Sequence, residues 1–481
     1  MKKGREILSV IMAGAMIFGV SACASPTSST GSNAAATPPP ATTAAATSEA
    51  AVQPAADAAS SGKTVINMYE FTDEVSNMLD KFKELNPDWA AKYDVNPTII
   101  ATTDGAYQPA LDAALAAGGS AAPDIYTAES AFVLKYTQGD MASYAASYKD
   151  LGIDVDNLVK QAQIAQYTID IGTRPSDNAL VGLGYQATGG ALIYRRSIAK
   201  DTWGTDDPAT IATKVGPGWD QFFKAAVDLK AKGYGIVSGD GDIWHAVENS
   251  SDQGWIVNNK LYIDPKREAF MDLSKQLYDN GWSNKTTDWT DAWYGDMKDA
   301  NDQKIFSFFG PAWLINYVMA GNSGGTKPGE GTYGDWAVCN SPIGFFWGGT
   351  WLLANKDSQL KDAIAPFIQW VTLDSSQTGL QYFWANGTLA GPGGTKDAVA
   401  SGTVMSQSNG TLDFLGGQNM FDVFVPANQY ANGKNMTQYD QTIDQYWRDQ
   451  TNAYTSGSKT KDQAIADFKQ NVADNLDIQV N

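Results

Sequence analysis

The sequence predicts an α/β fold divided into two lobes, and three observations lead to this prediction. Short apolar runs alternate with helical patterns along the chain, which is typical of a mainly parallel sheet covered by helices. The folded portion, residues 62–481, is longer than one hydrophobic core usually supports. Its segments also leave each lobe and return to it. We therefore expect two discontinuous lobes, residues 62–187 with about 342–390, and residues 188–341 with about 391–481.

The clearest alternation lies at the start of the folded portion. Residues 63–69 and 94–100 have the apolar content of strands, and residues 75–85 and 107–117 favour helices, in the first case because apolar side chains fall three or four positions apart. Residues 123–126 predict the next strand. Tyr126 and Glu129 then lie at its carboxyl end, where open α/β sheets bind their ligands.

Residues 179–194 predict a passage of the chain between the lobes. They contain two short apolar segments separated by Thr188, Gly189 and Gly190, a composition suited to a strand that bends. We interpret this stretch as a hinge. The remaining predicted elements are helices at residues 219–229, 266–278, 361–371 and 463–476, and strands at residues 236–237, 305–309 and 350–354.

The N-terminus has the pattern of an export signal. Basic residues precede an apolar stretch, residues 7–20, which ends in small side chains before Cys23. Residues 1–22 therefore predict a signal peptide that is absent from the mature protein, and the apolar stretch is too short to remain as a spanning helix.

Residues 24–61 predict a disordered tether. They consist almost entirely of Ala, Ser, Thr and Pro, a composition that cannot form a core. A flexible coil of about forty residues spans roughly 35 Å. The net charge of −19 argues against nucleic acid as a partner, since phosphate binding needs clustered basic side chains. Cys339, the only other cysteine, has no intramolecular partner once Cys23 is modified.

Residues 20–23, Val-Ser-Ala-Cys, resemble the bacterial lipobox, in which the cysteine becomes the lipidated first residue of the mature chain. This resemblance implies that Cys23 carries the lipid and that residues 23–61 join it to the folded body. The protein is then anchored to the outer face of the cell membrane. An ordinary signal peptide followed by a chance cysteine is the alternative.

Five segments resemble the extracellular solute-binding proteins of carbohydrate ABC importers, the maltose-binding-protein-like group. They lie in the expected order at residues 107–126, 189–196, 218–222, 308–313 and 348–356. The resemblance spans the chain from Lys63 onward and implies a periplasmic-binding-protein-like fold, with a sugar bound in the cleft between two lobes and delivered to a membrane permease. We expect a monomeric receptor without enzymatic activity or cofactor. Extra segments around residues 143–177 and 401–439 leave the identity of the sugar open.

Sugar recognition needs aromatic rings for stacking on C–H faces and carboxylates as hydrogen-bond partners of hydroxyls. Both kinds occur where the resemblance places the cleft, and their abundance favours an oligosaccharide. The predicted ligand-binding residues are Glu70, Asp73, Tyr126, Glu129, Trp347 and Trp351 from the first lobe, Tyr185 from the hinge, and Asp242, Trp244 and Trp313 from the second lobe.

The tryptophans and two of the acidic residues have a structural alternative. Core packing explains Trp313 and Trp351 equally well, and charge at a helix N-terminus would explain Glu70 and Asp73. Trp244 is favoured because residues 238–245 look like a polar, glycine-rich loop.

Other functional classes receive less support. His245 is the only histidine, so a catalytic triad or a histidine-based metal site would depend wholly on it, and we predict neither. Asp240, Asp242 and nearby oxygen atoms could bind calcium, but their spacing matches no EF-hand loop, so a structural calcium ion stays an open alternative. An exported glycoside hydrolase would need two carboxylates roughly 5 to 9.5 Å apart, and returning lobes are not a barrel pattern. A surface adhesin would suit the tether equally well but would not need the cleft residues.

Overall fold

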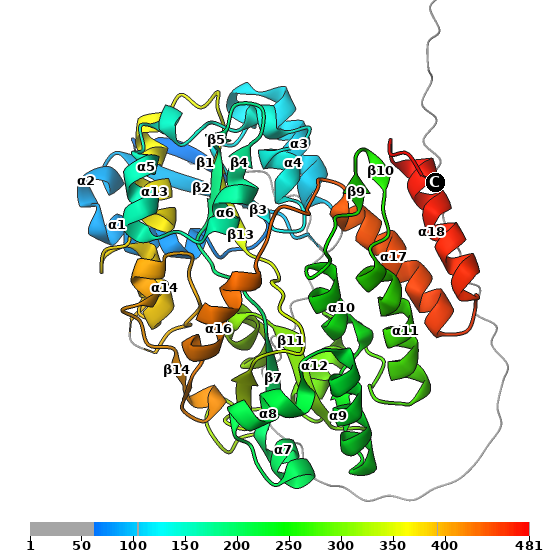
Figure 1. Cartoon of the computed structure of the whole chain (residues 1–481). Coiled ribbons are helices and arrows are strands. Elements are labelled where there is room, and N and C mark those ends of the chain that lie inside the picture. The colour runs from blue at the N-terminus through cyan, green and yellow to red at the C-terminus, as the bar shows by residue number, and fades with distance from the viewer. Residues whose placement is uncertain (1–61, 103–104, 392, 481) are drawn as a thin grey trace, which may run out of the picture. The chain divides into compact units, whose positions relative to one another are not determined.

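The computed structural model describes residues 62–102, 105–391 and 393–480. The predicted signal peptide, Cys23 and the predicted tether lie outside the described residues. The described residues belong to one compact unit, which is built on two separate mixed sheets (Figure 1). No helix in these ranges is both long and apolar enough to span a membrane.

The first sheet combines strands from distant parts of the sequence. Its strand order is β2-β1-β3-β13-β6. Strands β1, β2 and β3 are parallel, whereas β13 is antiparallel to both β3 and β6. The bounds are β1 (Thr64–Glu70), β2 (Tyr93–Ile99), β3 (Ile125–Glu129), β6 (Gly182–Gly184) and β13 (Thr350–Ala354).

Both faces of the first sheet are buried. Ile125 and Tyr126 are neighbours in β3 and contribute to two different apolar clusters, because adjacent residues of a strand point to opposite faces. One cluster includes Phe82 and Phe367, and the other includes Tyr107. The helices that supply these side chains are α1 (Leu79–Leu85), α13 (Lys361–Thr372) and α3 (Tyr107–Ala117).

The second sheet has the strand order β12-β7-β11-β8. Strand β7 is antiparallel to β11 and β12, and β11 is parallel to β8. Buried apolar side chains again lie on both faces, with Phe306 in one cluster and Phe308 in another. The bounds are β7 (Ala191–Arg195), β8 (Gly235–Val237), β11 (Ile305–Gly310) and β12 (Trp336–Cys339).

Helices from the middle and the end of the chain pack together beside the second sheet. Helix α10 contacts β11 and α11, α11 contacts α17, and α17 contacts α18 (Figure 1). The buried residues Ile443 and Trp447 of α17 join the same cluster as Phe270 of α11. The bounds are α9 (Trp219–Ala231), α10 (Asp240–Glu248), α11 (Pro265–Asp279), α17 (Asp440–Thr455) and α18 (Lys461–Asn475).

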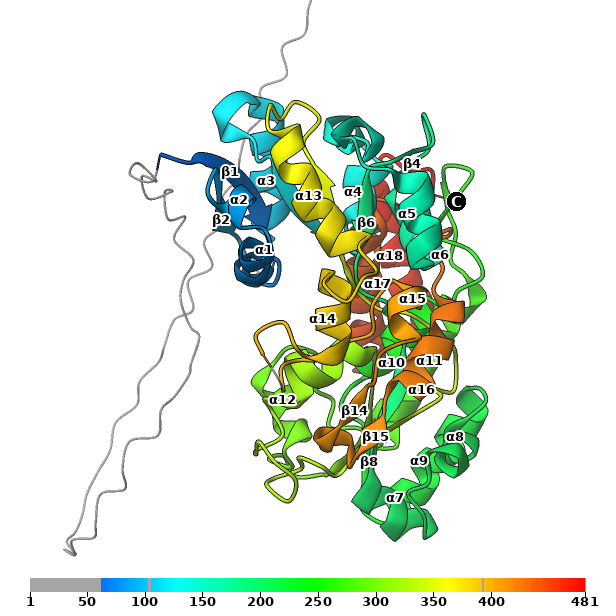
Figure 2. The same cartoon turned by 90° about the vertical axis from the view of Figure 1, so that its left-hand side faces the viewer.

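Shorter elements complete the fold (Figure 2). The helices are α2 (Pro87–Ala90), α4 (Val133–Thr137), α5 (Val155–Ala162), α6 (Gln166–Gly172), α7 (Arg196–Trp203), α8 (Pro208–Val215), α12 (Asp291–Met297), α14 (Leu380–Asn386), α15 (Gly402–Met405), α16 (Phe421–Ala427) and a π-helix (Leu314–Met319). The strands are β4 (Thr173–Arg174), β5 (Ala179–Leu180), β9 (Ile256–Val257), β10 (Lys260–Leu261), β14 (Thr411–Leu412) and β15 (Gln418–Asn419). Single 3₁₀ turns lie at Ser76–Met78, Gly119–Ala121, Ala142–Tyr144, Lys149–Leu151, Asp413–Leu415 and Asn428–Tyr430.

Between successive strands the chain passes from one sheet to the other twice, and these two crossing segments contact each other. The first crossing runs from β6 to β7 and the second from β12 to β13. Gly189 pairs with Phe346, and the amide of Trp347 donates to the carbonyl of Thr188 at 3.0 Å. The predicted passage of residues 179–194 between two sheets is thereby confirmed. Its action as a hinge and the lobe boundaries stay predictions.

One local prediction is wrong. Residues 238–245 do not form a loop, because helix α10 begins at Asp240. The carboxylate of Asp242 accepts the amides of Ser238 at 3.0 Å and Gly239 at 3.1 Å, so it satisfies backbone donors at the start of the helix. This capping outweighs the glycine content that suggested a loop.

Trp351 provides a test of the core packing. Its side chain is 1% exposed, and its indole N–H donates to the carbonyl of Thr168 at 3.1 Å. Trp351→Ala is expected to lower the free energy of unfolding by about 3–5 kcal/mol, because a large cavity remains. The same substitution at Trp289, which is 47% exposed, is expected to cost less than about 1 kcal/mol. Urea denaturation of both variants checks this, and equal losses would contradict the burial described.

Candidate functional site

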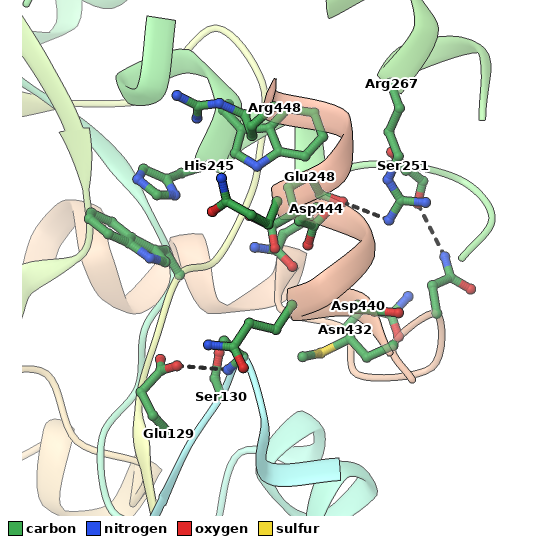
Figure 3. Close-up of a pocket in the computed structure, with 18 residues that line it drawn as sticks. Glu129, Ser130, His245, Glu248, Ser251, Arg267, Asn432, Asp440, Asp444 and Arg448 are labelled. Atoms are coloured by element: carbon green, nitrogen blue, oxygen red, sulfur yellow. Dashed lines mark hydrogen bonds between the residues drawn. The ribbon is translucent and has the colours of Figure 1, made fainter. Parts of the chain in front are cut away.

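A cavity of about 250 Å³ lies between elements attached to the two sheets (Figure 3). One wall comes from the carboxyl end of β3 and the turn after it. The opposite wall comes from α10, α11 and α17, and Trp347 of the second crossing closes one side. Asn249 and Ser251 after α10 and the loop residues Asn432, Asn435 and Met436 complete the lining.

Three of the ten predicted ligand-binding residues line this cavity: Glu129, Trp244 and Trp347. The other seven do not line it: Glu70, Asp73, Tyr126, Tyr185, Asp242, Trp313 and Trp351. Trp313 lies next to the cavity, because its ring centroid is 4.7 Å from that of Trp347 and its indole N–H donates to the carbonyl of Trp347 at 3.1 Å.

Trp347 is the centre of an aromatic group at the cavity. Its indole stacks on the imidazole of His245, with centroids 3.6 Å apart and planes at 13°. The ring of Trp289 lies nearly parallel to that of Trp313, with centroids 6.2 Å apart, and its centroid is 6.1 Å from that of Trp347. Trp289 is half-exposed, so the aromatic group continues from the cavity wall to solvent. Sequence reasoning missed Trp289, although a tryptophan in the polar stretch of residues 283–290 is the kind of signal that was used for Trp244.

Glu129 presents a carboxyl group between the sheets. Its Oε2 accepts the amide of Ala131 at 2.8 Å, and burial raises its pKa to about 7. Gly348, with φ of +75°, lies beside its Oε1. A Cβ at position 348 would be 3.4 Å from that oxygen and 3.3 Å from the ring of Trp313. Glycine at this position therefore leaves room for the carboxyl group beside the aromatic ring.

A group of acidic side chains on α10 and α17 lines the opposite wall. It consists of Glu248, Asp440 and Asp444, and sequence reasoning missed all three. Burial raises the pKa of Glu248, raises that of Asp440 to about 7, and together with the adjacent Glu248 holds that of Asp444 well above its usual range. The indole N–H of Trp255 donates to Asp444 at 2.6 Å. These side chains lack a sequence signal, because they share no motif and come from two helices, α10 and α17, that are distant in sequence.

Trp244 and Trp351 are core side chains. Trp244 is 3% exposed and packs on Phe270 with centroids 4.7 Å apart, although part of its surface lines the cavity. Trp351 is buried beneath the first sheet against Tyr167. Trp351 therefore packs in the core, which was the structural alternative to ligand binding.

The acidic residues Glu70 and Asp242 serve neighbouring backbone groups. Glu70 accepts the amides of Val75 at 3.1 Å and Ser76 at 3.3 Å, and burial raises its pKa to about 7. Asp242 caps α10 and also accepts the indole N–H of Trp293 at 3.4 Å. Asp73 is exposed, and Tyr126 is fully buried.

Tyr185 lies at the first crossing among further buried acids. Its hydroxyl donates to the carboxyl of Glu74, whose pKa burial raises to about 7. Nearby, Asp397 accepts the side-chain amide of Gln186 at 3.1 Å and the indole N–H of Trp384 at 3.4 Å. Burial, with a contribution from Glu74, raises the pKa of Asp397 to about 8. In the part of the chain that the structure describes, no group of three acidic, histidine or cysteine side chains is arranged to hold a metal ion.

Comparison with known proteins identifies the architecture. The family model described as bacterial extracellular solute-binding protein matches residues 73–378. The galacto-N-biose/lacto-N-biose I-binding protein of the ABC transporter from Bifidobacterium longum, in complex with lacto-N-biose, is 16% identical. The match has a TM-score of 0.64 and covers 87% of this chain and 99% of that chain.

Two further solved structures are similar. The ABC transporter associated binding protein from B. animalis subsp. lactis, in complex with β-1,6-galactobiose, has 18% identity, a TM-score of 0.60 and coverage of 86% of this chain and 97% of that chain. An ABC substrate-binding protein from Listeria monocytogenes, in complex with cycloalternan, has 15% identity, a TM-score of 0.56 and coverage of 86% and 98%. Curated protein sequences give no match. The predicted two-lobed α/β fold is confirmed.

The buried carboxyl group of Asp397 predicts a pH dependence. Its folded-state pKa of about 8 exceeds the ordinary value of 3.8, so the native state holds an extra proton between these values. The contribution of Asp397 to the free energy of unfolding is therefore largest at low pH, and it is lost as the pH rises to about 8. In the wild type the free energy of unfolding should fall between pH 5 and pH 8. Asp397→Asn should make this slope shallower, by up to about 1.4 kcal/mol per pH unit.

Urea denaturation at a series of pH values measures this effect. Asp449→Asn, on the exposed side of α17, provides the matched control and should follow the wild-type curve. Parallel curves for the wild type and Asp397→Asn would show that Asp397 is ionised in the folded protein.

Proposed function

The chain belongs to the bacterial extracellular solute-binding proteins, and from this premise we propose that it captures a carbohydrate in the cavity and delivers it to an ABC import permease. It is a binding receptor and not an enzyme. The observation that carries the proposal is the lining of the cavity, where the indole of Trp347 and the carboxyl group of Glu129 face the same space. Aromatic rings and carboxylates are the groups that recognise sugar faces and hydroxyls.

An oligosaccharide is the ligand class that we favour. The three similar structures named above are described with lacto-N-biose, β-1,6-galactobiose and cycloalternan, whereas a fourth is described with α-D-tagatose, a single sugar. The cavity of about 250 Å³ is smaller than the roughly 300–1,000 Å³ of typical ligand pockets. A longer ligand therefore extends out of it, and the aromatic group that reaches Trp289 offers further stacking surface.

Closure of the two lobes around the ligand couples binding to transport. Elements on both sides of the cavity are in contact, since Gln108 donates to Gln441 at 2.7 Å and the amide of Asp140 donates to Gln438 at 2.9 Å. A sugar that touches both walls favours this arrangement over an open one, because only its differential affinity shifts the equilibrium. The crossings serve as the hinge, with lobe boundaries near residues 187, 341 and 390. Tyr185, beside the first crossing, contacts the ligand only when the lobes close.

We assign direct ligand contact to Glu129, Trp244 and Trp347, with Trp313 supporting Trp347 from behind. His245 and Trp289 join this set because they share the aromatic group. Glu70, Tyr126, Asp242 and Trp351 instead maintain the fold around the site.

Trp347→Ala tests the stacking surface. Loss of the indole should weaken oligosaccharide binding about 10- to 100-fold, corresponding to about 1.4–2.8 kcal/mol, while the melting temperature of the free protein changes little. Tryptophan fluorescence and thermal shift measure both quantities. Trp203→Ala, which removes a tryptophan of α7 outside the cavity lining, is the control.

The same experiment separates a receptor from a hydrolase. Binding without consumption of the sugar supports the proposal, and product formation on chromatography would overturn it. Unchanged affinity in Trp347→Ala would place the sugar elsewhere.

We also propose that Cys23 carries a lipid and that residues 23–61 tether the folded body to the membrane. A receptor that hands its solute to a membrane permease benefits from a flexible linker, which keeps its local concentration high.

Cys23→Ser should shift the protein from the membrane fraction to the soluble fraction, because the only proposed anchor is lost. Mass spectrometry of the mature N-terminus is the companion measurement. A Cys23→Ser protein that stays membrane-bound would contradict the proposal, whereas Cys339→Ser should leave the distribution unchanged.

A further inference from the structure

The loop that leads into α17 connects the two sides of the cavity. This loop, residues 431–439, is called the strap below, and it ends the extra segment around residues 401–439. It runs past α4 before the chain enters α17 (Figure 1). Three of its residues, Asn432, Asn435 and Met436, line the cavity. The strap is therefore part of the cavity wall as well as a connection between helices.

The strap packs closely on elements around the first sheet. Gln438 accepts the amide of Asp140 at 2.9 Å. A Cβ at Gly139 would collide with the side chain of Gln438, and a Cβ at Gly433 would collide with that of Ile171. Glycine at both positions therefore lets the strap lie directly against α6 and the turn after α4.

The other extra segment, around residues 143–177, supports the strap from below. It contributes Ile171, and Met436 of the strap packs on the same apolar cluster. The two extra segments also meet at a second point, where Ile164 pairs with Ser401 and the hydroxyl of Ser401 donates to the carbonyl of Ala162 at 2.7 Å. They consequently form one continuous structure beside the cavity.

Asn435 fastens the strap to the side of the second sheet. Its side-chain amide donates to the carbonyls of Ser251 at 3.1 Å and Asp252 at 3.0 Å, in the turn after α10. A Cβ at Gly254 would collide with the carbonyl oxygen of Asn435. Ser251 itself lines the cavity. The strap thus spans the gap between the two sides and is attached to both.

The strap and the aromatic group lie at different ends of the cavity. Figure 3 shows His245 and Asn432 on opposite sides of the space that they line. His245 stacks on Trp347, and the aromatic group continues from there to the half-exposed Trp289. The aromatic end of the cavity therefore leads toward solvent, whereas the strap covers the other end.

We propose that the strap determines specificity by closing one end of the cavity, so that the protein takes up the terminal unit of a saccharide. This role rests on the proposed carbohydrate function and specifies which part of the ligand is bound. The terminal unit lies with its hydroxyls toward Asn432 and Asn435, because amide side chains both donate and accept hydrogen bonds. The rest of the chain leaves past Trp347 and Trp289. An internal stretch of a long chain does not fit, because the strap leaves no passage for its second half.

The reactivity of a thiol at position 251 tests the closed end without any ligand. The full chain carries Cys23→Ser and Ser251→Cys, and the reagent is a glucose-conjugated methanethiosulfonate, which is about the size of a sugar unit. From the aromatic end, this reagent reaches position 251 only across the whole cavity. Asn435→Ala removes two hydrogen bonds of the strap, and Gly433→Val pushes it away from α6. Each should speed modification at least about tenfold, because a second entrance opens.

Three controls accompany this measurement, with rates read by mass spectrometry of the peptides. Lys434→Ala changes an exposed side chain of the strap outside the cavity lining and should leave the rate unchanged. Trp289→Cys, made in place of Ser251→Cys, places the thiol at the aromatic end and should respond less than about twofold to Asn435→Ala, since two lost hydrogen bonds far from it do not alter its exposure. Cys339 is buried in β12, so its slow modification in every variant shows that the protein stays folded.

Acceleration at position 251 with Cys339 still protected supports the closed end. A rate at position 251 that neither strap variant changes overturns the inference, and so does an equal acceleration at position 289. Acceleration that Cys339 shares comes from unfolding and also contradicts it. None of these results depends on saccharide binding. Failure of the carbohydrate function, seen as a flat fluorescence response to saccharides, is therefore distinguishable from failure of the strap to close the cavity.

Discussion

The contact between the two crossing segments is the constraint on which the site depends. Gly190 packs so closely that a Cβ at this position would lie 2.1 Å from the ring of Phe345, and at Gly189 it would lie 2.6 Å from the backbone of Ala427. Only glycine allows this approach. The hydrogen bond from Trp347 to the carbonyl of Thr188 then holds the indole where both sheets meet. The position of the Trp347 indole in the cavity wall is thus fixed by the backbone packing of the two crossing segments next to it.

The cavity is also lined by acidic side chains. Carboxyl groups converge on it from β3, α10 and α17, and burial disfavours their ionised forms. The same helices form part of the second core, where Trp447 and Phe270 are buried. Packing of these helices therefore brings the charges together, and the unfavourable burial is offset by apolar contacts on the other side of α17. Such placement of titratable groups in a cleft is typical of a functional site.

Periodicity and composition predict the class of fold well and the cavity only partly. The first three strands and α3 follow from short-range patterns. Residues 188–190 indicate the crossing, because two glycines between apolar segments suit a strand that bends. Helix α10 was missed because Asp242 caps it through contacts that composition does not reveal. Helix α17 was missed because its polar sequence conceals a narrow buried stripe that includes Ile443 and Trp447. The acidic wall could not be predicted, since it exists only after helices distant in sequence pack together.

The central claim is that a carbohydrate binds between the two sheets, and a crystal structure of the protein with a bound saccharide tests it most directly. The account predicts a sugar ring in the cavity against Trp347, with ligand oxygen or nitrogen atoms in hydrogen-bond contact with Glu129 and with the α10 and α17 side. A saccharide bound outside this cavity, or contacting only one of its walls, would contradict the account.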